Sequence, residues 1–228
     1  MAQSPSLLAS WDACLDHTGH WLEAPSLGQL RNVPAGTLLY DQGAPSRHFF
    51  LIREGLVRCS MLHDSGRRLL LELMGPGTMF GEGAAFDGHP RYVHAETVTD
   101  ARLSVYTKED ILRAPDPVAL LQGVIKIMAS KQRVLAGKLL EFNSEEPEGR
   151  LRHLLAKLVA VQRRARPEDE RRAAQVWLSQ ETLAEMCGMS RISAARALRR
   201  LAEVGLVRTH ARYVEVLDVQ TLARPMRC

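Results

Sequence analysis

The sequence lacks most features that mark membrane, secreted or metal-cluster proteins. It has only 4 cysteines in 228 residues, and Cys14, Cys59, Cys187 and Cys228 stand far apart. This spacing gives neither a disulfide framework nor a Cys-x-x-Cys metal or cluster site. No stretch approaches the roughly 18 consecutive apolar residues of a membrane-spanning helix, and the N-terminus lacks the basic start and apolar stretch of a signal peptide. We therefore expect reduced thiols, a cytoplasmic location and no contact with a membrane.

Motifs for catalysis are missing as well. The chain has no nucleophile elbow, no phosphate-binding loop and no His-Glu-x-x-His zinc motif. Cupin-type metal enzymes, which are built on a roll-like β-domain, hold their metal with a His-x-His pair. The chain has no such pair. We expect no catalytic residue, no metal site and no enzymatic function.

Positive charge is concentrated toward the C-terminus. Residues 1–147 hold 14 Lys and Arg against 17 Asp and Glu, whereas residues 148–228 hold 16 against 9. A local excess of cationic side chains suits a polyanionic partner, because such side chains release the counterions condensed on a phosphate backbone. A solvated basic surface would show the same composition, so charge alone leaves both interpretations open.

From about Pro25 to Val105 the chain consists of short apolar segments separated by turns that contain glycine, proline or aspartate. Examples are TLLY at 37–40, HFFLI at 48–52, RLLLELM at 68–74 and RLSVY at 102–106. Short strands at regular spacing favour an antiparallel barrel, roll or sandwich. We predict an all-β domain here.

A long helix is predicted from Pro117 to about Asn143. Apolar residues alternate at spacings of three and four, the pattern by which two helices bury a common seam. The stripe consists of Val118, Leu121, Ile125, Met128, Gln132, Leu135, Leu139 and Phe142. A helix packed on its own domain is the alternative, and Leu120, Val124, Ile127, Val134 and Leu140 widen the stripe so that one side faces the β-domain. We expect a homodimer formed through this helix, with the polar Gln132 fixing its register.

After a helix over about 149–164 and an exposed charged loop at 163–175, the segment 178–207 indicates a helix, a tight turn and a second helix. Ser179 caps a helix over 180–186, Gly188 supplies the turn, and Ser190 caps a helix that runs to about Val204. Residues 206–217 alternate apolar and polar around His210 and Ala211, which predicts a hairpin. The whole is a winged helix-turn-helix, a DNA-binding motif.

On the second helix, Ala194, Ala197, Leu198 and Leu201 share the packing face, and the opposite face is basic. Because arginine pairs with guanine in the major groove, we predict that Arg191 and Arg196 contact bases. Arg199, Arg200 and the helix start at Ser179 are expected at phosphates. Arg208, His210 and Arg212 of the hairpin could also reach a phosphate, although an exposed hairpin carries such residues for solubility too. The predicted DNA contacts are Ser179, Ser190, Arg191, Ile192, Ser193, Ala195, Arg196, Arg199, Arg200 and Arg212.

Together these segments resemble the Crp/Fnr family of bacterial transcription regulators. The carriers are VPAGTLLYDQGAPSRHFFLIREGLVR (33–58), LMGPGTMFGE (73–82), FDGHPR (86–91) and LSQETLAEMCGMSR (178–191). The resemblance implies an α+β protein with an N-terminal antiparallel, cyclic-nucleotide-binding-like β-roll, a long dimerisation helix and a C-terminal winged helix-turn-helix domain. We expect an N-terminal helical or irregular segment at 1–24, the effector-sensing roll at 25–108, the long helix and hinge at 109–146, and the DNA-binding domain at 147–228.

The resemblance also implies an effector pocket in the roll. In cyclic-AMP-binding members a Gly-Glu pair holds the ribose, an Arg-Ser pair the phosphate, and Thr and Ser of the long helix the adenine. Here Gly81, Glu82 and Arg91 match, Tyr92 replaces the serine, and Leu135 and Ala136 stand at the helix positions, where neither side chain can hydrogen-bond a base. The expected pocket disfavours cyclic AMP, and Glu82 with Arg91 would form an ion pair without a ligand.

Other effectors known for the family stay open or are disfavoured. An iron–sulfur cluster is not expected, because Cys14 stands alone before Cys59. Haem that senses carbon monoxide or nitric oxide is the alternative cofactor, with His48, His63, His89 and His94 as candidate axial ligands.

The recognition helix departs from the family pattern at Ile192, where a glutamate is usual. Ile192 would meet a thymine methyl rather than a cytosine amine. We expect an effector-controlled homodimeric regulator on double-stranded DNA, with an inverted-repeat operator that has guanine in each half-site, and RNA polymerase as a further candidate partner. The alternatives are a haem-dependent gas sensor and a cyclic-nucleotide-responsive signalling module without DNA contact.

Overall fold

The computed structural model describes residues 17–23, 27–62, 68–144, 146–165 and 168–223, with the backbone alone at residues 68, 138, 140–144, 164–165, 170 and 173. Contacts divide the chain into two compact units. Residues 10–62 and 71–135 form the first, and residues 136–228 form most of the second. Each unit buries its own apolar core.

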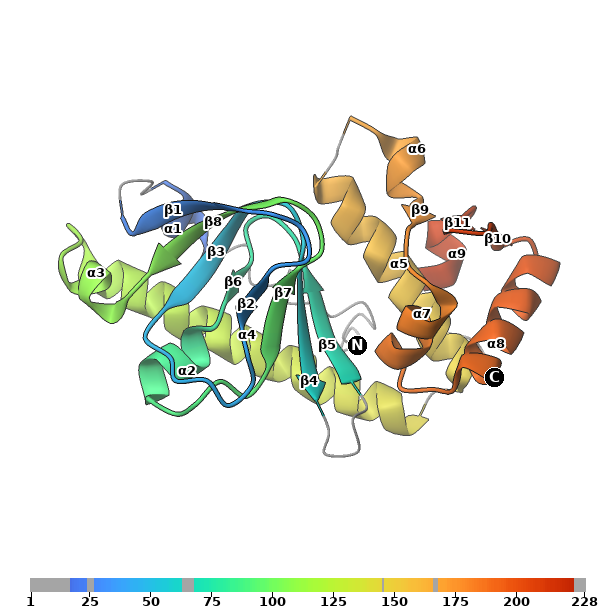
Figure 1. Ribbon diagram of the computed structural model, residues 1–228, viewed down its shortest axis with the longest axis horizontal. Helices are drawn as coiled ribbons and strands as arrows, with labels where there is room; N and C mark the ends of the chain where they lie inside the picture. The colour runs from blue at the N-terminus through green and yellow to red at the C-terminus, as the bar shows by residue number, and fades with distance from the viewer. Residues whose placement is uncertain (1–16, 24–26, 63–67, 145, 166–167, 224–228) are drawn as a thin grey trace, which may run out of the picture. The chain divides into compact units, whose positions relative to one another are not determined.

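Eight strands form the roll of the first unit (Figure 1). They are β1 (Gln29–Val33), β2 (Leu38–Tyr40), β3 (Phe49–Glu54), β4 (Val57–Leu62), β5 (Arg68–Met74), β6 (Met79–Phe80), β7 (His94–Thr97) and β8 (Ala101–Tyr106). They make two four-stranded sheets, in the orders β1-β8-β3-β6 and β2-β7-β4-β5. The strand pairs whose register is described are antiparallel, which confirms the predicted antiparallel roll.

Strand β3 is buried on both faces. Its side chains alternate between the two sides of the sheet. Phe49 stacks on Tyr106 with ring centroids 5.3 Å apart, in the core outside the roll. Phe50 stacks inside on Tyr40 at 5.9 Å and on Phe80 at 5.0 Å. This double burial explains why the segment is continuously apolar.

Four helices accompany the roll: α1 (Gly19–Leu22), α2 (Glu82–Asp87), α3 (Lys108–Leu112) and α4 (Pro117–Ser144). Leu120, Val124 and Ile127 of α4 join a buried cluster with Trp21 and Phe49. Figure 1 shows α4 passing along the roll beside α2. The prediction that the apolar residues beside the seam face the roll is thereby confirmed for these three residues.

The second unit is mainly helical. Its elements are α5 (Pro147–Ala165), α6 (Glu170–Ala173), α7 (Gln180–Met186), α8 (Arg191–Glu203) and α9 (Val219–Ala223), with strands β9 (Gln175–Val176), β10 (Val207–Thr209) and β11 (Val214–Val216) in the order β10-β11-β9. The predicted helix-turn-helix and hairpin are confirmed, as is the fold class. The prediction of a loop at 163–175 is wrong in part: α6 forms there because Asp169 caps it, accepting a hydrogen bond from the Arg172 N–H at 2.9 Å.

Candidate nucleic-acid interface and ligand pocket

Two serine residues begin the helices of the predicted DNA-binding motif. The Ser179 hydroxyl accepts a hydrogen bond from the Thr182 N–H at 3.0 Å, and the Ser190 hydroxyl accepts one from the Ser193 N–H at 3.1 Å. Such a bond satisfies an N–H group that has no partner within its helix. Gly188, in the turn between the helices, has a φ of 60°, a conformation that favours glycine. The predicted caps and turn are confirmed.

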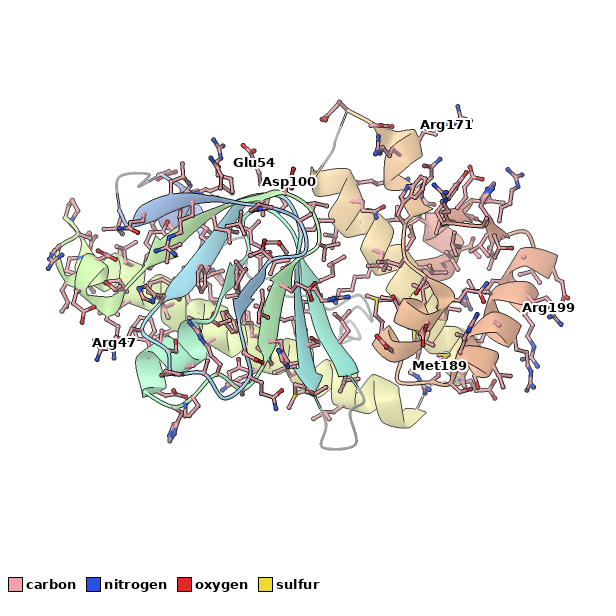
Figure 2. The ribbon with its side chains drawn as sticks, in the orientation of Figure 1. Arg47, Glu54, Asp100, Arg171, Met189 and Arg199 are labelled. Atoms are coloured by element: carbon pink, nitrogen blue, oxygen red, sulfur yellow. The ribbon has the colours of Figure 1, made fainter. Side chains whose placement is uncertain are left out.

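Helix α8 divides into a buried and an exposed face, as its periodicity predicts. Ala194, Ala197, Leu198 and Leu201 are at most 4% exposed. Arg191, Arg196 and Arg199 are exposed, Ile192 is 73% exposed, and Ser193 and Ala195 are partly buried. Figure 2 shows Arg199 projecting from α8 into solvent. A large apolar side chain among exposed arginines suits contact with a partner surface.

The basic side chains of this unit differ in what they contact. The Nη1 atom of Arg200 lies 3.5 Å from Glu148 Oε2 on α5. In the hairpin, Glu215 Oε2 lies 3.2 Å from both Arg208 Nη1 and His210 Nε2. Arg191, Arg196, Arg199 and Arg212 make no hydrogen bond or ion pair with another described residue. These last four are therefore available to a phosphate or a base.

The roll contains a buried ion pair that links it to the long helix. Glu82, the first residue of α2, is 3% exposed, and its Oε1 atom accepts a hydrogen bond from Lys131 Nζ at 2.7 Å. Lys131 of α4 is 5% exposed and also donates to the Met79 carbonyl at 2.8 Å. A charge taken out of water requires such compensation. Lys131 carried no functional signal in the sequence, where it was one charged residue outside the heptad stripe.

Arg91 is compensated differently. It is 5% exposed, and it donates to the Gly81 carbonyl at 2.6 Å and to the His48 carbonyl. Its guanidinium carbon lies 4.0 Å from the centroid of the Tyr40 ring, a cation–π contact. Burial lowers the pKa of Arg91. The predicted ion pair between Glu82 and Arg91 is therefore wrong, because Lys131 reaches Glu82 from α4 and carbonyl oxygens hold Arg91.

Gly81 makes this arrangement possible. Its φ is 79°, and a Cβ atom there would lie 2.6 Å from Arg91 Nη1. Any larger residue would push the guanidinium out of place and strain the backbone.

Two polar atoms of the predicted effector residues stay unsatisfied. Glu82 Oε2 and Arg91 Nε are buried and have no hydrogen-bond partner among the described residues. Arg91 also lines a cavity of about 340 Å³ together with Arg31, Arg47, Tyr40 and Phe50. Three arginines around one cavity make it suitable for an anion.

Tyr92, Leu135 and Ala136, also predicted at the effector pocket, are not among the residues that line this cavity. Tyr92 is 50% exposed, and its ring lies against Gly83. Burial raises the pKa of the Tyr92 phenol to about 12, and the negative charge of Glu82 adds to the effect. Leu135 is partly buried and Ala136 is exposed. The buried group thus consists of Glu82, Arg91 and Lys131.

The candidate haem ligands have other environments. His94 Nδ1 lies 2.6 Å from Asp41 Oδ1. His48 and His89 are exposed, and His63 lies outside the described residues. Within the described ranges, no group of three or more His, Cys, Asp or Glu side chains could hold a metal ion.

The predicted seam of α4 is largely exposed. Val118 is 61% exposed, Ile125 65% and Leu139 64%, Leu121 is 36% exposed, and Gln132 is exposed between them. Met128 packs in part against the roll core. The side chain of Phe142 lies outside the described residues. A row of large apolar side chains in water suits a helix that binds a second helix.

None of the helices in the described ranges is long and apolar enough to cross a membrane.

Comparison with known families identifies both units. The cyclic nucleotide-binding domain family matches residues 30–115, and the Crp-like helix-turn-helix domain family matches residues 149–224. A CRP-like cAMP-activated global transcriptional regulator of Mycobacterium tuberculosis is 30% identical over 198 residues, which cover 86% of this chain and 87% of the relative. The cyclic AMP receptor protein of Thermus thermophilus is 29% identical over 200 residues, covering 87% and 88%.

Solved structures with the same fold agree. The c-di-GMP-responsive global regulator CLP of Xanthomonas campestris superposes with a TM-score of 0.71 at 21% identity, covering 91% of this chain and 99% of that one. A CRP-family transcriptional regulator from Thermus thermophilus gives a TM-score of 0.67 at 26% identity, covering 84% and 94%.

Proposed function

This chain belongs to the Crp/Fnr family of transcription regulators, and on that premise we propose that it acts as a homodimer that binds an inverted-repeat operator and is controlled by a small anionic effector. The family consists of DNA-binding regulators rather than enzymes. A signalling module without DNA contact, considered above, does not hold, because residues 149–224 match the Crp-like helix-turn-helix domain.

The observation that carries the DNA proposal is the outward face of α8. Arg191, Ile192 and Arg196 are exposed at the N-terminal part of the helix, which is the part that reaches base edges in helix-turn-helix proteins. Each arginine can pair with a guanine, and Ile192 with a thymine methyl. In a two-fold dimer the two helices would meet half-sites about 34 Å apart, one turn of DNA.

Selection from a random DNA pool with the purified protein tests this proposal. We expect an inverted repeat with guanine in each half-site. Arg196→Ala should cost about 1–3 kcal/mol of operator binding and relax the preference at one position. Arg171→Ala, which removes the same charge from α6 (Figure 2), is the matched control and should bind normally. Equal affinity of the parent protein for operator and random DNA would contradict the proposal.

The dimer proposal rests on the exposed seam of α4. Aspartate at Ile125 and Leu139 would place charges in a helix–helix interface while changing side chains that are 65% and 64% exposed in the single chain. We expect this double variant to sediment as a folded monomer. Lys126→Asp, on an exposed position away from the seam, should remain dimeric. A double variant that stays dimeric would show that the seam of α4 is not the dimer interface.

The effector proposal rests on the pocket around Arg91. The cavity of about 340 Å³ is lined by Arg31, Arg47 and Arg91, and the buried Arg91 Nε atom has no partner among the described residues. A bound anion with hydrogen-bond acceptors would satisfy this atom. Such a ligand could alter α4, which carries both Lys131 and the seam, and thereby the spacing of the two recognition helices.

Cyclic AMP is the second candidate as effector. Two relatives are named for it, and Gly81, Glu82 and Arg91 are in place. Leu135 and Ala136 cannot replace the threonine and serine hydroxyls that hold adenine in the cyclic-AMP-binding members, and the larger Tyr92 stands in place of the phosphate-binding serine, so we favour a different anion. Calorimetric titration with cyclic AMP decides: heat of binding with micromolar affinity would support cyclic AMP, and no heat would support our preference.

Haem remains an alternative cofactor, and its test is a visible spectrum of the protein purified from its own host. A Soret band would show that the protein binds haem and would contradict the proposal of a small anionic effector.

A further inference from the structure

The ion pair between Lys131 and Glu82 joins the two parts of the first unit whose relative position matters for dimerisation. Glu82 belongs to α2, which follows directly from β6 of the roll, and Lys131 belongs to α4, which carries the seam. Both are at most 5% exposed, and Lys131 Nζ also holds the Met79 carbonyl of β6. One ammonium group therefore ties the long helix to two neighbouring elements of the roll.

Lys131 lies on the side of α4 that packs on the roll. At about 100° per residue, Lys131 is a neighbour of Val124 and Ile127 on the side that packs on the roll, both of which are at most 2% exposed. Gln132 and Ile125 are exposed and face another direction. A bond at Lys131 therefore fixes the rotation of α4 about its own axis, and with it the direction in which the seam points.

Apolar contacts alone fix rotation less strictly. Val124 and Ile127 hold α4 by packing, and hydrophobic attraction itself has no direction. A buried ion pair with hydrogen bonds at 2.7 and 2.8 Å adds a directional restraint, because a displaced ammonium would lose its partners in a medium where water does not replace them.

We propose that Lys131 is a positioning residue that holds α4 in its dimer-forming rotation without a ligand, so that the chain dimerises and binds its operator with an empty pocket. The effector then modulates a coupling between roll and helix that already exists. This inference rests on the proposed function as a dimeric DNA-binding regulator.

The experiment uses the full chain, stripped of small molecules by refolding and checked by native mass spectrometry. The dimer dissociation constant is measured by sedimentation and the operator affinity by fluorescence anisotropy, on the operator selected by the parent protein. The parent should bind without added ligand. Lys131→Met should weaken dimer and operator binding by about tenfold or more, and Lys126→Met, an exposed lysine of the same helix, should leave both unchanged.

Hydrogen exchange of β3 and β8 separates positioning from unfolding. Retained protection with weaker dimerisation supports the proposal. If Lys131→Met loses this protection, Glu82→Gln replaces it, since the amide keeps an acceptor for Lys131 and removes the charge, and it should weaken dimerisation in the same direction. The double variant Lys131→Met with Glu82→Gln should be no weaker than Lys131→Met, because the two residues act through one contact.

Unchanged dimer and operator constants in a variant with a folded roll would overturn the inference. So would a parent protein that binds its operator only after cyclic AMP or another ligand is added. Both results leave the proposed function intact. A parent protein that selects no DNA sequence under any condition would instead refute the proposed function.

Discussion

The charged candidate residues of the first unit are buried, whereas those of the second unit, the winged unit, are exposed. In the first unit, Glu82, Arg91 and Lys131 are at most 5% exposed, and each has a partner within the chain. In the winged unit, Arg191 and Arg196 are exposed and have no partner among the described residues. A buried charge needs its partners to keep the fold, whereas an exposed one is free to exchange water for a phosphate. Substitutions of these buried charged residues should therefore change stability, and those of the exposed arginines on α8 should change binding.

The two buried cysteines, one in each unit, report how readily each unit opens to a thiol reagent. Burial raises the pKa of Cys59 and of Cys187 from 9.0 to about 12. At pH 8 both thiols are therefore protonated in the folded chain. Because Cys59 is 0% and Cys187 3% exposed, a disulfide reagent reaches each thiol only when its unit opens, and we expect the reaction, followed by mass spectrometry, to be much slower than in the unfolded chain. Because the folded pKa is the higher one, this contribution to stability is complete below about pH 9 and is lost as the pH rises toward 12. Faster labelling of Cys187 than of Cys59 would show that the winged unit opens more readily.

Removing the charge of Arg91 should test the roll directly. Arg91→Met leaves the Gly81 and His48 carbonyls without their donor, and we expect a loss of about 3 kcal/mol in the stability of the roll. Hydrogen exchange of β3 and β8 is the measurement. Arg31→Met, an exposed residue of the same cavity, should lose little. Equal losses of stability in both variants would mean that the burial of Arg91 does not make it more important to the fold than the exposed Arg31.

The cap of α8 should separate stability from binding within the winged unit. Ser190→Ala removes the hydroxyl that accepts from the Ser193 N–H and should cost about 1 kcal/mol of stability. Ser190→Asp keeps an acceptor and should restore stability, but its charge should repel DNA phosphates. Thermal unfolding and operator titration measure the two effects, and parallel changes in both would break the proposed separation.

The smallest effect is expected at Arg199. Arg199→Ala should leave the stability of the fold within about 0.5 kcal/mol and lower the slope of log affinity against log salt by about 0.9. Arg200→Ala should change the slope less, since Arg200 already lies 3.5 Å from Glu148. Titrations across a salt series decide, and an unchanged slope for Arg199→Ala would remove this residue from the DNA surface.

The DNA-binding motif was predictable because its signals are local. The serine caps, the turn at Gly188 and the division of α8 into two faces all follow from residues within four positions of one another. The exposed seam of α4 follows from the same kind of periodicity. Whether these residues bind DNA and a second chain stays a prediction.

The ligand pocket was only partly predictable, since its contacts join distant parts of the chain. Glu82 and Lys131 are 49 residues apart, and periodicity gives no hint of which acid a buried lysine will meet. The expectation that Arg91 would pair with Glu82 failed because Arg91 turns to two carbonyl groups, and backbone acceptors have no signature in a sequence.

The outward face of α8 also has an evolutionary consequence. Arg191, Ile192 and Arg196 are exposed, and the two arginines make no hydrogen bond or ion pair with another described residue. The residues proposed to select an operator can therefore be exchanged while the packing residues Ala197 and Leu198 stay as they are. A duplicated copy of this gene could thus acquire a new set of target promoters in a few mutational steps, each passing through a folded protein.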